Sequence, residues 1–183
     1  MNRDDALALV KEMNTQPGHV SHALAVEAAM RSYARRFGED EEVWGLVGLL
    51  HDFDYEVYPD LHDHTIKGGE ILREKGYPDH LITAIRSHND ATSVPRTERL
   101  HHALHACDEL SGFITACALV RPSKSVMDLE TKSVVKKMKD KAFARPVNRE
   151  EMRQAAEELG VEFGEHVANV IEAMRRVAGE LGL

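Results

Sequence analysis

Several histidine and aspartate side chains lie on apolar helix faces, or at the ends of apolar helices, that are expected to face the interior of the fold. His51 and Asp52 are adjacent at the end of the most apolar segment, and His22 shares a predicted helix face with apolar residues. His88 ends another apolar stripe, and Asp108 lies within a mostly apolar helical segment. Imidazole nitrogens and carboxylate oxygens together suit divalent transition metals. The pattern therefore indicates a buried metal site.

Each of these residues alone also has a structural explanation. A single histidine on an apolar face is usually hydrogen-bonded to a carbonyl group, and a lone aspartate in a helix often joins a local hydrogen bond. These five ligand-type groups left unsatisfied would together cost roughly 5–15 kcal/mol, at about 1–3 kcal/mol each. Because a whole fold is stable by only about 5–15 kcal/mol, a shared metal ion explains the five groups better than five separate roles.

Helical periodicity dominates the rest of the chain, so helices must position these groups. No segment shows a convincing strand pattern, and residues 52–63 are expected to form a loop. Asp4 or Asp5 should cap the first helix, Pro17-Gly18 should break the chain, and Gly38 should end the second helix. The expected helices cover about 4–14, 19–36, 40–51, 65–75, 78–88, 97–120, 127–138, 148–159 and 165–181.

These helices predict an all-α, single-domain helical bundle that spans residues 1–183. The length of 183 residues suits one domain with a sizeable core. The region that carries the motif of histidines and aspartates lies at about 18–120, and the helices of 121–183 are expected to pack on it. Clear apolar stripes in the last two helices favour packing against the same domain over binding a partner.

The acidic balance of the chain limits its partners. A formal charge of −8 opposes binding to nucleic acid or to an anionic membrane. Residues 121–149 are an exception, with nine Lys or Arg against three acidic residues. This basic segment is either a solvated helix and loop or a rim that attracts an anionic substrate.

Two further patterns indicate a cytoplasmic protein without a membrane partner. Cys107 and Cys117 lie ten residues apart in one predicted helix, about 15 Å, which is too far for a disulfide. Free thiols suit a reducing compartment. The N-terminus lacks the apolar run of a signal peptide, and the longest apolar stretch, 43–50, is too short to cross a bilayer. No pattern specifies an oligomeric state.

The order His22, His51-Asp52 and Asp108 resembles the HD superfamily of metal-dependent phosphohydrolases. The signature of that superfamily is a His, a His-Asp pair and an Asp on successive helices. The resemblance implies an HD-type helical bundle and a metal site on these four residues. The stretches HDFDYEVYPD, HTIKGGEIL and CDELSGFITACALVRPSK further look like a group of small bacterial HDIG-type hydrolases.

Two more histidines resemble the additional ligands of dinuclear HD proteins, such as the HD-type diadenosine-tetraphosphate hydrolases of bacteria. His64 precedes the pair Gly68-Gly69 by four residues, and His88 ends the stretch AIRSH. The resemblance implies a second metal on His64, His88 and a bridging Asp52. His62 is an alternative to His64 but fits the spacing less well. The cofactor is expected to be one or two divalent ions of Fe, Mn, Ni, Co or Zn.

The expected activity is hydrolysis of a nucleotide or another small phosphorylated metabolite by metal-activated water, with His51 and Asp52 at the catalytic centre. Lys67, Arg86 and Lys124 are the candidate substrate-binding cations. Two alternatives remain. One is a di-iron oxygenase, because some HD-fold oxygenases share the dinuclear ligand order. The other is a non-catalytic protein that binds metal or nucleotide for regulation.

Overall fold

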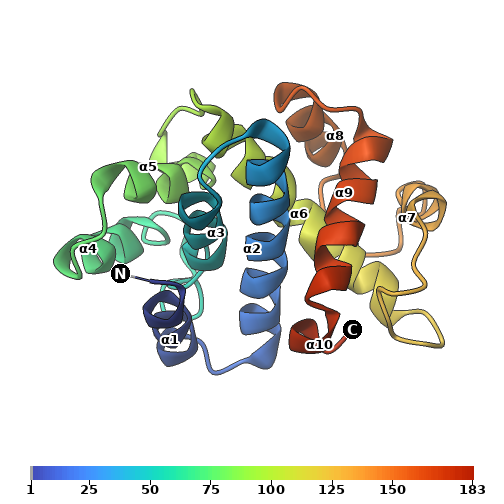
Figure 1. The fold of residues 1–183 in the computed structure, drawn as a ribbon, viewed down its shortest axis with the longest axis horizontal. Coiled ribbons are helices and arrows are strands. Elements are labelled where there is room, and N and C mark those ends of the chain that lie inside the picture. The colour runs from blue at the N-terminus through green and yellow to red at the C-terminus, as the bar shows by residue number, and fades with distance from the viewer. Residues whose placement is uncertain (1) are drawn as a thin grey trace.

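The computed structural model describes residues 2–183, which form helices and turns without a strand (Figure 1). The predicted all-α class is confirmed. In chain order the elements are α1 (Arg3–Met13), α2 (Pro17–Phe37), α3 (Glu41–Leu50), α4 (Ile66–Glu74), α5 (Asp79–Ser87), the 3-10 helix η1 (Asp90–Thr92), α6 (Arg99–Leu119), α7 (Thr131–Lys137), α8 (Arg149–Glu158), α9 (Phe163–Arg176) and α10 (Ala178–Leu181).

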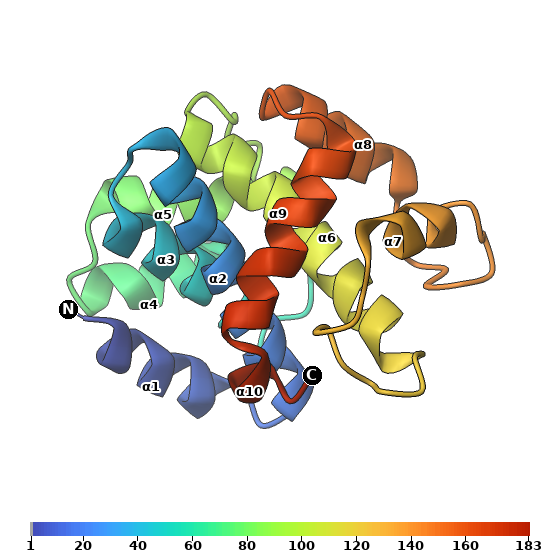
Figure 2. The same cartoon turned by 45° about the vertical axis from the view of Figure 1, so that its right-hand side comes forward.

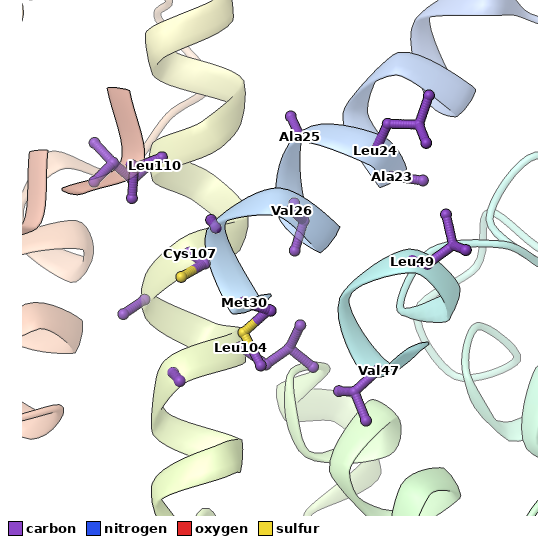
Figure 3. Close-up of a cluster of buried hydrophobic side chains, with 14 of the residues drawn as sticks. Ala23, Leu24, Ala25, Val26, Met30, Val47, Leu49, Leu104, Cys107 and Leu110 are labelled. Atoms are coloured by element: carbon purple, nitrogen blue, oxygen red, sulfur yellow. The ribbon is translucent and has the colours of Figure 1, made fainter. Parts of the chain in front are cut away.

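Helix α2 runs through the middle of the molecule and packs against α3, α6 and α9 (Figures 1 and 2). Val26 and Met30 of α2 lie between Val47 of α3 and Leu104 of α6 (Figure 3). All four side chains are fully buried. One continuous apolar core extends from α1 to α10, so the helices that carry the histidines and aspartates are fixed against one another.

A glycine lets α3 approach α2 closely. A Cβ atom at Gly48 would lie 2.9 Å from the carbonyl oxygen of Val26 and 3.0 Å from the Cα of Glu27. Because both atoms belong to the backbone, no side-chain rotation could relieve the contact. The close approach places the end of α3, where His51 and Asp52 follow, beside the helix that carries His22.

The N-termini of α1 and α2 differ from the sequence expectation. The side chain of Asn2, rather than that of Asp4 or Asp5, caps α1, and the Asn2 and Asp5 side chains each accept the other's backbone N–H. The break between the first two helices lies just before Pro17, which occupies the first turn of α2, where its missing N–H costs nothing. Gly38 ends α2 with a φ of 72°, as predicted.

The C-terminal third contains shorter helices than predicted. The helix expected over 127–138 begins only at Thr131, because the preceding residues form a turn in which Arg121 and Ser123 bind the Asp128 carboxylate. The helix expected over 165–181 is interrupted at Val177, which separates α9 from α10. The stripes on α8 and α9 are buried in the core, as their periodicity predicted.

The structure also bears on the thiols and on membrane insertion. Cys107 and Cys117 are buried free cysteines, as expected from their separation. Among the helices of residues 2–183, none combines the length and the apolar character needed to cross a bilayer.

A buried histidine ties α9 to α2 and α6 and makes the fold sensitive to acid. Nε2–H of His166 donates to the carbonyl oxygen of Ala106 at 2.9 Å, so Nδ1 accepts a hydrogen bond from the Tyr33 hydroxyl at 2.6 Å. Burial lowers the pKa of His166 from 6.5 to about 4, although the bond to Ala106 opposes the shift. The folded protein therefore holds this ring neutral.

We expect His166 to destabilise the fold progressively as the pH falls from 6.5 toward 4. The folded pKa lies below the unfolded one, so the unfolded chain takes up the proton first. The loss should be on the order of 3 kcal/mol by pH 4. Urea unfolding across this range should show a steeper decline for the wild type than for His166→Gln. Parallel curves would contradict this assignment.

Candidate metal centre

Five structural elements bring the six predicted ligand residues into two adjoining groups. His22 lies in the second turn of α2, His51 and Asp52 follow α3, His64 lies in the turns before α4, His88 follows α5, and Asp108 lies in the middle of α6. One group contains His22, His51, Asp52 and Asp108, and the other contains Asp52, His64 and His88. Within each group, one ligand atom per residue lies within 4.8 Å of all the others.

The first group is compact. Nε2 of His22 lies 3.0 Å from Oδ1 of Asp108, and Nε2 of His51 lies 3.2 Å from Nε2 of His22. The same His51 nitrogen lies 3.5 Å from Oδ2 of Asp52. Ligand atoms bound tetrahedrally at about 2.0–2.2 Å from one ion stand about 3.3–3.6 Å apart. The spacing in this group is therefore close to that of a single coordination shell.

The second group uses the other oxygen of the same carboxylate. Oδ1 of Asp52 lies 3.1 Å from Nε2 of His64 and 3.2 Å from Nε2 of His88. The two imidazole nitrogens are 3.4 Å apart. Asp52 thus directs one oxygen toward each group, which is the arrangement of a carboxylate that bridges two ions.

The hydrogen bonds behind the imidazole rings fit cation binding. Nδ1–H of His51 donates to the carbonyl oxygen of Gly48 at 2.8 Å, and Nδ1–H of His88 donates to that of Ile85 at 2.6 Å. In a neutral ring this leaves Nε2 as a bare lone pair. Because each of these lone pairs faces another imidazole nitrogen, a proton or a metal ion must lie between them.

When no metal is bound, the charges at the centre favour protons on its imidazole rings. Burial alone would lower the pKa of His51, but the Asp52 and Asp108 carboxylates raise it to about 9. Burial also disfavours the charged form of His64, yet its hydrogen bonds to Asp52 and Asp54 raise its pKa to about 9. A metal ion must displace these protons, so its affinity should rise with pH.

The two carboxylates remain charged despite their surroundings. Burial raises the pKa of Asp52, but the His51 charge and the hydrogen bonds from His64 and His88 hold it well below its ordinary value. Burial likewise opposes ionisation of Asp108, and the His51 charge with the hydrogen bond from His22 lowers its pKa far below the ordinary range. Both carboxylates are therefore ready to bind a cation.

A cavity of about 510 Å³ opens over both groups. This volume suits a small metabolite. Three kinds of side chain form its walls: ligand-type groups, apolar groups and polar groups outside the two clusters. The lining residues are His22, Asp52, His64, His88 and Asp108, then Tyr55, Leu61, Ala91, Gly112 and Val147, and finally Asn89, Asp90, Glu109 and Glu151.

No lysine or arginine of residues 2–183 lines this cavity. Nζ of Lys67 lies 3.3 Å from a Glu70 carboxylate oxygen, the Arg86 side chain packs against Gly69, and Lys124 is exposed in a turn. The structure does not bring these three cations to the cavity, and their role in substrate binding stays a prediction. From the basic segment 121–149, only Val147 reaches the cavity wall.

The structure adds Asp54 to the residues that support the centre. Its carboxylate is buried and contacts Nδ1 of His64. The sequence contained one signal for it, a second aspartate two positions after Asp52. Glu109 and Glu151 of the cavity wall were also overlooked. Burial, followed by the charges of Asp108 and Glu151, raises the pKa of Glu109.

The remaining histidines lie outside the two groups. His62 is exposed, so His64 is the histidine that this loop contributes. Nε2 of His105 lies 3.9 Å from a Glu151 carboxylate oxygen. His101 is buried, and Nδ1 of His19 pairs with Glu56.

Comparison with known proteins identifies similarity over the part of the chain that carries the centre. Residues 20–121 match the family model described as HD domain. Ribonuclease Y of Lactobacillus gasseri and ribonuclease Y of Lactobacillus johnsonii are each 30% identical over 98 residues. These matches cover 50% of this chain but only 17% of each relative. No solved structure matches the chain significantly.

Proposed function

The chain belongs to the HD domain family, and on that premise we propose that it hydrolyses a phosphoric ester or anhydride with two divalent metal ions. The substrate would be a nucleotide or another small phosphorylated metabolite. The observation that carries this proposal is Asp52, whose two oxygens face two separate groups of imidazole nitrogens. Such a bridge is typical of two-ion phosphoester hydrolases.

In the proposed reaction, the six residues of the two groups would bind the metal ions. His22, His51 and Asp108 would hold the first ion, His64 and His88 the second, and Asp52 both. When bound, Fe, Mn, Ni, Co or Zn ions polarise phosphoryl oxygens and lower the pKa of water. Metal ions would also draw an anionic phosphate into a cavity otherwise lined by carboxylates. Tyr55 and Leu61 offer apolar surface to the organic part of the substrate.

Glu109 is the carboxyl group best suited to protonate the leaving oxygen. It lines the cavity beside Asp108, where partial burial shifts its pKa upward, in the direction that favours a protonated carboxyl group. We expect Glu109→Gln to lower kcat about 10²-fold for an alkyl phosphate, whose leaving group needs a proton. It should lower kcat by less than about threefold for p-nitrophenyl phosphate, whose leaving group needs none. Equal losses with both substrates would contradict this role.

A metal-reconstituted substrate panel tests the proposed function. Protein stripped of metal and reloaded with manganese, iron or zinc would be assayed on phosphomonoesters, nucleotides, dinucleoside polyphosphates and single-stranded RNA. RNA belongs in the panel because the curated relatives are ribonucleases by name. We expect metal-dependent phosphate release from at least one small substrate. Oxygen uptake by the iron-loaded protein without any hydrolysis would instead favour the oxygenase alternative.

A further inference from the structure

Asp54 is a buried carboxylate whose two oxygens have different tasks. Its side chain is 1% exposed. Oδ1 accepts a hydrogen bond from Nδ1–H of His64 at 2.9 Å. Oδ2 accepts the backbone N–H groups of Thr65 and Gly68, each at 2.9 Å. One side chain therefore joins the His64 ring to the backbone where α4 begins.

The backbone around Asp54 is shaped to admit this carboxylate. A Cβ atom at position 68 would lie 2.6 Å from Oδ2 of Asp54, so only a glycine leaves room for it. Thr65 has a φ of 62°, in the left-handed region that is costly for a β-branched residue. Its N–H donates to Asp54, and this bond helps hold the turn in place. The turn that brings Asp54 into contact with Nδ1 of His64 therefore includes a strained backbone conformation at Thr65.

His64 differs from the other two histidines whose hydrogen bonds leave Nε2 free. His51 and His88 donate Nδ1–H to backbone carbonyl oxygens. A backbone carbonyl accepts a hydrogen bond whichever residue it belongs to, so a substitution there does not remove the acceptor. The partner of His64 is a side chain. The tautomer of His64 is therefore the one that a single substitution can reverse.

We propose that Asp54 is the positioning residue of the second metal ion, because it keeps the proton of His64 on Nδ1 and leaves Nε2 free to bind. The inference rests on the proposed two-ion centre. It assigns to Asp54 control over the second ion alone, since its hydrogen bonds reach no ligand of the first group.

The isosteric substitution Asp54→Asn should reverse this control. The asparagine oxygen would stay on the N–H groups of Thr65 and Gly68, because turning it away would leave two buried donors unpaired. The amide NH₂ group would then face Nδ1 of His64. Because an amide N–H needs an acceptor, His64 would move its proton to Nε2 and lose the lone pair that binds metal.

Zinc titration with nitrogen NMR tests the proposal on three proteins. They are the wild type, Asp54→Asn and Asp63→Asn. Asp63 is exposed in the same loop and its side chain makes no hydrogen bond to His64, so this control removes the same charge without the contact. We expect Asp54→Asn to bind the second zinc about 10–100-fold more weakly and to bind the first normally. At a zinc concentration that fills the second site of the wild type, the variant should show a proton on Nε2 of His64 and none on Nδ1. The control should match the wild type.

Two results would overturn the proposal. One is wild-type affinity for the second zinc in folded Asp54→Asn protein. The other is a proton on Nε2 of His64 in zinc-loaded wild type, which needs no variant and decides the matter if Asp54→Asn fails to fold. Both readouts are independent of turnover. If zinc binding depends on Asp54 but no phosphoester is hydrolysed, the proposed function fails and the inference stands.

Discussion

Asp52→Ala should release both metal ions and lower phosphoester turnover by at least about 10³-fold. Loss of a single electrostatic donor in an active site costs about 10²–10³-fold, and Asp52 serves two ions. Oδ2 faces His51 of the first group, and Oδ1 faces His64 and His88 of the second. Without the bridge, two cations would stand close together with no shared anion between them.

Asp63→Ala is the matched control for this loss. Asp63 lies in the loop before α4, it is exposed, and it belongs to neither metal group. Metal content by mass spectrometry and turnover should be measured on the same folded samples, with folding checked by circular dichroism. A folded Asp52→Ala protein that keeps either ion at wild-type affinity would show that Asp52 does not bridge.

His88→Ala should remove one metal ion and keep the other. Nε2 of His88 lies 3.2 Å from Oδ1 of Asp52 and 3.4 Å from Nε2 of His64. His88 is not a member of the first group, which therefore keeps all four of its ligand residues. We expect one equivalent fewer of bound metal, an intact helical signal, and turnover reduced by at least about 10²-fold, since one of the two ions that stabilise the transferred phosphoryl group is missing. His64→Ala should behave in the same way.

His22→Ala is the reciprocal variant. It removes a ligand from the first group and none from the second, so the second ion should be the one retained. Spectroscopy with cobalt in place of the native ion would distinguish the site that remains in His22→Ala from the site that remains in His88→Ala.

If His88→Ala keeps its full metal content and full turnover, the second site is wrong and His88 is a buried structural histidine.

Residue type and periodicity were sufficient to predict the helices that carry the centre. The apolar faces around His22 and Asp108 and the apolar segment before His51 marked helices that had to be buried, and the structure buries all three. Caps and breaks were less predictable, because Pro17 can either start or interrupt a helix. The break at Val177 has no comparable signal in the sequence.

The supporting contacts could not be predicted for a different reason. Asp54 binds His64, ten residues away, through a turn whose geometry requires a positive φ at Thr65 and a missing Cβ at Gly68. No local pattern specifies that combination. The positions of Lys67 and Arg86 were also beyond sequence reasoning, since nearness in sequence to His64 and His88 did not place either cation in the cavity.

Anomalous diffraction from crystals grown with zinc tests the central claim, a two-ion centre bridged by Asp52, most directly. The predicted result is two zinc peaks about 3.5–4 Å apart. One should lie within bonding distance of His22, His51 and Asp108, the other of His64 and His88, and both of Asp52. A single peak, or peaks bound elsewhere on the chain, would contradict the account.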